Sequence, residues 1–189
     1  MNRTRRKQSK YGPKSTKGLW AYVKRLNEDR AKKISAAIVE FASLHSVDAI
    51  VMEHLDFKGC KKRGSKAQRL SMWNHGIIRE KVEQKAHLLG IRIATICAWK
   101  TSALAFDGSG SVTRDDNNHA LAKFTTGKQY NCDLSASYNI GARYFIRELL
   151  KSLPATEESR VKAKVPDAGR RTSCTLSTLR ALVEELSAA

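Results

Sequence analysis

The sequence is poor in acidic residues and contains no long apolar run. It has 18 Asp and Glu against 35 Lys and Arg, which gives a formal net charge of +17. This imbalance favours a polyanionic partner over a neutral one, although a ribosomal-type or merely soluble basic protein has the same composition. No apolar run approaches the roughly 20 residues of a membrane helix, and none follows the N-terminal charges as in a secretory signal. We therefore expect no membrane partner and a cytoplasmic, nucleoid-associated location.

Paired cysteines and several catalytic motifs are also absent. None of the four cysteines, Cys60, Cys97, Cys132 and Cys174, belongs to a C-x-x-C pair, so neither a disulfide framework nor a zinc ribbon is expected. The sequence has no glycine-rich phosphate loop, no G-x-S-x-G and no H-E-x-x-H. These absences argue against nucleotide-hydrolysing P-loops, serine hydrolases of the elbow type and zinc proteases.

The N-terminal part is basic and then becomes periodic. Residues 1–18 contain no acid and include two glycines and a proline, which predicts a flexible arm. Residues 19–44 carry apolar side chains three and four apart, which predicts a helix with Leu19, Tyr22, Val23, Leu26, Ile34, Ile38, Phe41 and Ala42 as its apolar stripe. The charged face of this helix is either solvated or in contact with phosphates.

Two apolar runs flank a second helical segment. Residues 47–52 form a short β-branched run, as in a strand that is buried on both faces. Residues 71–89 have helical periodicity, and residues 91–97 form a second strand candidate. The segment is therefore a predicted βαβ unit with a crossover helix, and the fold class is α/β. The basic stretch 56–69 is either a solvated linker or a loop that contacts a nucleic-acid backbone.

The remaining segments differ sharply in pattern. Residues 100–132 are rich in loop-forming residues, and residues 134–153 return to helical periodicity before Pro154. Residues 154–174 are polar and are predicted to be disordered, whereas residues 176–186 can form a short terminal helix.

Two acidic residues mark the ends of predicted elements. Glu53 ends the first strand run, Ile50-Val51-Met52-Glu53-His54-Leu55, and Asp133 opens a helix in Asp133-Leu134-Ser135-Ala136-Ser137-Tyr138-Asn139-Ile140. By themselves, Glu53 could be a solvated strand end, and Asp133 could be an N-terminal residue favoured by the helix dipole. Carboxylates on rigid elements can also converge on Mg²⁺, which supports phosphodiester hydrolysis.

These two motifs, together with 76–96 and Thr101-Ser102, resemble the C-terminal RuvC-like half of the transposon-encoded TnpB (OrfB-type) family, which is related to type V CRISPR effector nucleases. The resemblance covers roughly residues 14 to 150. It implies an incomplete RNase H-like fold, a βαβ core with flanking helices whose first three strands are missing. It also implies an RNA-guided DNA endonuclease with two metal ions, Mg or Mn. In this resemblance Glu53 matches the second metal-binding carboxylate and Asp133 the third.

The resemblance also sets the expected organisation and partners. We expect a flexible arm at 1–18, a partial RuvC-like domain at 19–153 with a degenerate zinc-ribbon insertion at 100–132, and a polar tail at 154–189. The first carboxylate would come from an N-terminal complementary polypeptide or from a second copy of the chain, which would also cover the bare edge of the first strand. DNA and guide RNA are the expected partners. The residues expected to contact them are Arg5, Arg6, Lys7, Lys24, Arg25, Lys61, Lys62, Arg63, Lys66 and Arg69.

Two carboxylates bind a metal ion less well than three, so a second interpretation stays open. The chain could be a non-catalytic subunit that binds nucleic acid or regulates such a nuclease. A third interpretation is a truncated gene product without a stable fold.

Overall fold

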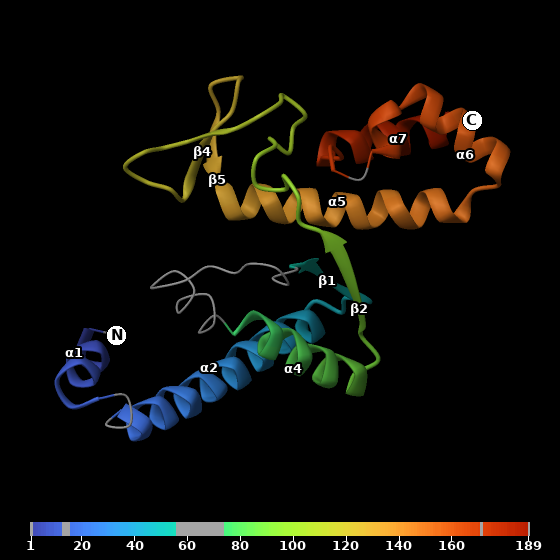
Figure 1. Ribbon diagram of the computed structural model, residues 1–189. Helices are drawn as coiled ribbons and strands as arrows, with labels where there is room; N and C mark the ends of the chain where they lie inside the picture. The colour runs from blue at the N-terminus through green and yellow to red at the C-terminus, as the bar shows by residue number, and fades with distance from the viewer. Residues whose placement is uncertain (1, 13–15, 56–73, 171, 189) are drawn as a thin grey trace. The chain divides into compact units, whose positions relative to one another are not determined.

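The computed structural model describes residues 2–12, 16–55, 74–170 and 172–188, and it is a mixed α/β structure with two small sheets (Figure 1). The described residues divide into two units. Those of the first fall within Met1–Ile50 and Phe57–Ile93, and those of the second within Val51–Asp56 and Ala94–Ala189. The α/β class predicted from the sequence is confirmed.

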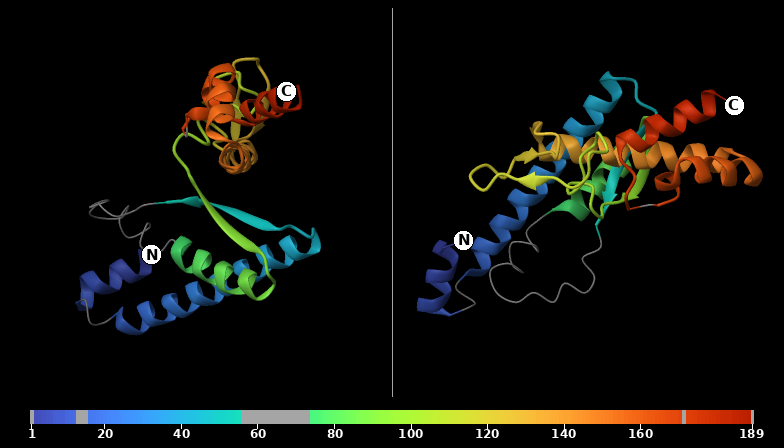
Figure 2. Two further views of the ribbon diagram at one scale, coloured as in Figure 1. Left: turned by 90° about the vertical axis from the view of Figure 1, so that its right-hand side faces the viewer. Right: turned by 90° about the horizontal axis from the view of Figure 1, so that it is seen from above.

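The first unit is built on two long helices, α2 (Lys17–Leu44) and α4 (His75–Leu88), which lie side by side (Figure 2). The buried residues of α2 are small or β-branched: Ala31, Ser35, Val39 and Ala42. The buried residues of α4 are Val82 and Ala86. Small side chains at three- and four-residue spacing let two helix backbones approach closely.

The helix predicted over residues 19–44 is confirmed, but its apolar side chains are only partly buried. Tyr22, Ile34 and Phe41 are exposed, and of the predicted stripe only Ala42 is buried. The contact with α4 uses the neighbouring face, where small residues fit. Among the described residues, Leu19, Val23 and Ile38 of α2 are partly buried.

The N-terminal segment also differs from the sequence-based expectation. Residues predicted as part of a flexible arm form helix α1 (Asn2–Tyr11), which ends at Gly12 with a φ of 82°. This positive φ is accessible to glycine without steric cost and stops the helix.

The two predicted strands pair with each other. Strands β1 (Ala49–His54) and β2 (Arg92–Cys97) form a two-stranded sheet, and the Arg92 amide donates to the carbonyl of Asp48 over 3.0 Å. Strand β1 begins two residues later than predicted, which places Glu53 inside the strand. The βαβ order of strand, helix and strand is the one expected.

The second unit is organised around helix α5 (Cys132–Ser152) (Figure 1). A three-stranded antiparallel sheet, β3 (Thr113–Arg114), β4 (Leu121–Lys123) and β5 (Gln129–Asn131), lies at its N-terminal end. Helices α6 (Ala155–Lys164) and α7 (Leu176–Ser187), with the short 3₁₀ helix η2 (Pro166–Gly169) between them, run alongside its C-terminal half.

The C-terminal helices pack against α5 in an apolar core that the sequence did not predict. Residues 154–174, predicted to be disordered, include α6 and η2. Val161 and Leu182 are fully buried and cluster with Ile146 and Leu150 of α5. The few apolar residues of this polar segment are spaced so that they meet on one side, and their burial stabilises it.

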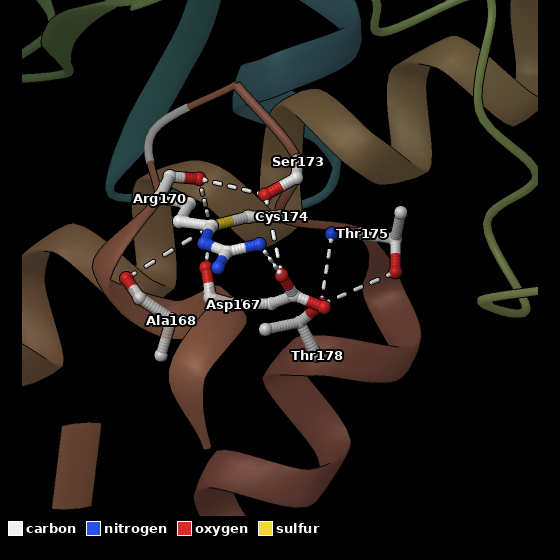
Figure 3. A network of polar contacts seen from close by, with 7 residues as sticks. All are labelled: Asp167, Ala168, Arg170, Ser173, Cys174, Thr175 and Thr178. Atoms are coloured by element: carbon white, nitrogen blue, oxygen red, sulfur yellow. Dashed lines mark hydrogen bonds and ion pairs between the residues drawn. The ribbon is translucent and has the colours of Figure 1, made fainter. Parts of the chain in front are cut away.

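The Cys174 thiol contacts backbone carbonyls at η2 and in the connection between η2 and α7. Its Sγ atom lies 3.0 Å from the Asp167 carbonyl and 3.1 Å from the Arg170 carbonyl (Figure 3). Burial raises the pKa of this thiol, and the positive charge of Arg143 opposes that shift. Cys174 therefore serves as a small buried residue of the core.

None of the helices in the described part of the chain is long and apolar enough to cross a membrane.

Truncating Leu182 tests whether α7 belongs to the folded core. Leu182→Ala should lower the free energy of unfolding by about 2–5 kcal/mol, because it leaves a cavity among fully buried side chains. Chemical denaturation measures this change. The adjacent Val183 is 45% exposed, so Val183→Ala should change stability by less than about 0.5 kcal/mol. Equal effects of the two changes would mean that α7 is not packed.

Candidate functional site

Glu53 lies near the end of β1, and its carboxylate is held by a neighbouring hydroxyl. The side chain is half-buried, and the Thr101 Oγ1 atom lies 3.3 Å from Glu53 Oε1. The same hydroxyl lies 3.0 Å from the Ala98 carbonyl, so its single proton serves two acceptors. Among the described residues, the Glu53 carboxylate has no other hydrogen bond or ion pair.

The turn that carries Thr101 is fixed by a buried asparagine on α5. The Nδ2 atom of Asn139 donates to the Thr101 and Leu104 carbonyls, each over 2.9 Å. Its Oδ1 atom accepts from the amide of Leu176 over 3.3 Å. Asn139 is fully buried, and each of its polar atoms has a partner, as burial requires.

One turn further along α5, the guanidinium of Arg143 is buried among backbone carbonyls. Arg143 is 4% exposed and donates to four oxygens at 2.7–3.2 Å, those of Cys97, Trp99, Thr172 and Cys174. Burial lowers the pKa of Arg143, and the nearby negative charge of Glu53 is among the groups that oppose this shift. The guanidinium therefore adds positive potential in the neighbourhood of Glu53.

Asp133 occupies the first turn of α5 and points into solvent. The Asn131 side chain caps the helix by accepting from the amides of Asp133 (2.9 Å) and Leu134 (3.1 Å). This cap fixes the backbone of Asp133, while its exposed carboxylate is favoured by the partial positive charge of the helix N-terminus.

Glu53 and Asp133 belong to the same unit. In the described part of the chain, no group of three or more His, Cys, Asp or Glu side chains is placed to hold a metal ion. The joint role of Glu53 and Asp133 as metal ligands stays a prediction.

The predicted nucleic-acid contacts fall into two groups. Arg5, Arg6 and Lys7 are exposed on α1, and Lys24 and Arg25 are exposed on α2. The remaining five, Lys61, Lys62, Arg63, Lys66 and Arg69, lie outside the described residues.

The insertion at 100–132 is built on an apolar core. Ala105, Ala122, Phe124 and Cys132 are buried together, and the Phe106 ring packs edge-on against Phe124 with 5.5 Å between centroids. Cys132 is one of these core side chains. The aromatic rings supply the cohesion of the small sheet by burial.

A cavity of about 730 Å³ opens beside β2 in the second unit. Its walls include Ile96, Ile146 and Leu150, and its basic residues include Arg147 and Lys151. Arg147 donates to the Thr95 carbonyl over 3.0 Å and pairs with Glu148, and Lys151 also pairs with Glu148. The basic side chains of this wall are thus largely engaged within the unit.

Sequence reasoning missed Thr101, Asn139 and Arg143 as a connected set. A signal was present for one of them, since Arg143 falls on the same helical stripe as the buried Ile146 and Leu150. A charged residue within an apolar stripe indicates a buried polar network. Its partners are backbone carbonyls from distant segments, which no side-chain pattern reveals.

Comparison with solved structures shows which known proteins have a fold similar to that of this chain. Nine chains of solved structures match, among them the protein in a cryo-EM structure of a Cas12f1–sgRNA–target DNA complex. The TM-score is 0.50 and the sequence identity 21%, over 66% of this chain and 37% of that chain. The similarity is one of fold. The chain thus spans little more than a third of the length of the matched Cas12f1 chain, and no family model and no curated protein matches it.

The apolar core of 100–132 predicts metal-independent folding. A strong chelator should leave the melting temperature and near-UV circular dichroism unchanged, because aromatic burial stabilises the sheet. Phe124→Ala should instead lower the free energy of unfolding by about 3–5 kcal/mol. Substituting the exposed Lys123 by Ala is the matched control. A chelator-induced fall in melting temperature would contradict this prediction.

Proposed function

We propose that this chain is the RuvC-like, RNase H-like portion of a TnpB-type, RNA-guided DNA endonuclease. The main supporting observation is that Glu53 lies in the C-terminal part of strand β1, one residue before its end, in an α/β structure similar in fold to part of a Cas12f1 chain. The matched structure contains an sgRNA and target DNA, which supports guide RNA and DNA as partners here. The net charge of +17 agrees with a polyanionic partner.

The donor set suits a hard divalent cation. Glu53 and Asp133 offer carboxylate oxygens, which Mg²⁺ and Mn²⁺ prefer. When bound, such ions stabilise the attacking and leaving oxygens of phosphodiester hydrolysis. The chain's own contribution is to hold one carboxylate in a partly buried, hydrogen-bonded position and the other on a capped helix end.

The hydrogen bonding at the edges of the β1–β2 sheet supports the proposal that a partner chain adds a further strand to this sheet. Because the Arg92 amide faces β1, the carbonyls of Thr95 and Cys97 face the opposite side. Arg147 and Arg143 donate to these two carbonyls, so the outer edge of β2 is closed. Among the described residues, β1 pairs only with β2. A strand carrying the first carboxylate would therefore add to β1, from an N-terminal complementary polypeptide or a second copy of the chain.

One observation favours the second candidate, a non-catalytic nucleic-acid-binding or regulatory subunit. No group of three potential metal-binding side chains occurs among the described residues. Binding that persists without divalent ions, with no cleavage under any condition, would support this role.

Cleavage with matched variants tests the nuclease proposal. The chain, its N-terminal complement, a guide RNA and Mg²⁺ should cut target DNA, and Glu53→Gln or Asp133→Asn should slow cutting by roughly 100-fold or more, because each loses a ligand charge. Glu184→Gln, an exposed change on α7 in the same unit, is the control. Equal cleavage by the wild type and Glu53→Gln would remove Glu53 from the site.

Salt dependence tests the proposed contacts of α2. If Lys24 and Arg25 contact phosphates, the double change to Gln should weaken binding and flatten the slope of log K against log[salt] by roughly 2, one per lost contact. Fluorescence anisotropy with labelled RNA and DNA measures this slope. The double change of the exposed Lys123 and Arg180 to Gln removes the same charge elsewhere. Identical slopes for the two double variants would exclude the α2 contact.

A further inference from the structure

The connection between η2 and α7 contacts the same α5 side chains that hold the turn beside Glu53. Asn139 donates to the Thr101 and Leu104 carbonyls and accepts from the Leu176 amide. Two chain segments about 70 residues apart in sequence thus share one buried side chain.

Arg143 repeats this bridge one turn along α5. Two of its four carbonyl partners, Cys97 and Trp99, belong to the end of β2 and the following turn. The other two, Thr172 and Cys174, belong to the connection that precedes α7. A planar guanidinium has five N–H donors in a fixed fork, so it can hold both segments at once, which an ammonium group cannot do in this geometry.

From these contacts we propose that Thr101, Asn139 and Arg143 are positioning residues for Glu53, and that the segment 172–176 is an integral part of the Glu53 site. Arg143 and Asn139 hold the turn through its backbone carbonyls, and both also bond to the segment 172–176. Thr101, whose carbonyl is held in this way, places its hydroxyl 3.3 Å from the Glu53 carboxylate. The role of Glu53 in cleavage rests on the proposed function, but its positioning does not.

Apolar packing of α6 and α7 against α5 holds the start of α7, and with it this hydrogen-bond network, in place. Leu182 and Val161 anchor α7 and α6 in the apolar cluster on α5, and the Ser177 amide donates to the Phe106 carbonyl over 3.0 Å. The C-terminal helices therefore act on the site through hydrogen bonds at the start of α7, while their own burial keeps that start in place.

The substitution Leu176→Pro tests the hydrogen bond between the Leu176 amide and Asn139 while preserving helix α7. Leu176 is the first residue of α7 and follows the extended Thr175, a position where proline is tolerated. Leu176→Pro removes the amide that donates to Asn139 and puts a carbon in place of the hydrogen. Leu176→Ala loses the same side chain but keeps the amide, and is the matched control.

Amide hydrogen exchange of the metal-free chain gives the first readout. The amides of Thr101 and Ala103, bonded to the Ala98 and Lys100 carbonyls, should exchange about fivefold faster in Leu176→Pro than in Leu176→Ala, as expected for one lost hydrogen bond. Equal exchange at these amides in the two variants overturns the proposal.

Thr101 gives a second readout that does not depend on α7. Thr101→Val removes the hydroxyl with little change in volume, and Thr101→Ser retains it. The ¹³C chemical shift of the Glu53 carboxyl should move in Thr101→Val and stay near the wild-type value in Thr101→Ser. An unmoved shift in Thr101→Val overturns the proposal, even if Leu176→Pro fails to fold.

These results separate the inference from the proposed function. If the chain cleaves no DNA but the exchange and chemical-shift differences occur, positioning of Glu53 stands and the nuclease role falls. If cleavage depends on Glu53 while both differences are absent, the nuclease role stands and the positioning network falls. In an active complex, Thr101→Val should lower kcat with KM for DNA unchanged, and Thr101→Ser should restore it.

Discussion

The second unit is organised around a buried positive charge, that of Arg143, which no carboxylate among the described residues bonds directly. The guanidinium of Arg143 would cost several kcal/mol to bury alone, and four backbone carbonyls offset that cost with charge-assisted hydrogen bonds. Since these carbonyls come from the end of β2 and from the connection before α7, the charge can be buried only when both segments are in place. Local folding of these segments is thereby coupled, and the turn beside Glu53 gains its fixed position from that coupling.

The two edges of the small β1–β2 sheet have different surroundings. Two strands alone bury little surface and rarely form a stable sheet. Here Arg143 and Arg147 of α5 donate hydrogen bonds to carbonyls at the outer edge of β2. Without these donors, the carbonyls would be unpaired and open to pairing with another strand. Under the proposed function, a further strand would therefore add at β1, beside Glu53, and not at the β2 edge that Arg143 and Arg147 contact.

Much of the secondary structure could be predicted from the sequence, and the exceptions have physical causes. The helices at α2, α4, α5 and α7 follow from three- and four-residue apolar spacing, and both strands follow from short β-branched runs. The apolar spacing of α2 predicted the helix but not its most buried residues, because close packing against α4 favours the small side chains Ala31, Ser35 and Ala42. Helix α6 was missed because its composition is polar and its order comes from the single buried Val161 and from α7.

The sequence by itself determined the strong positive charge, the place of Glu53 in the C-terminal part of a strand and the helix-start position of Asp133, since each follows from residue type and local periodicity. Only the tertiary structure decided that Thr101 contacts Glu53, that Asn139 and Arg143 bond to the turn carrying Thr101, and that both also bond to residues 172–176. The physical reason is that their partners are backbone carbonyls and amides. Every residue carries these groups, so sequence patterns cannot distinguish which of them a fold brings within hydrogen-bonding distance.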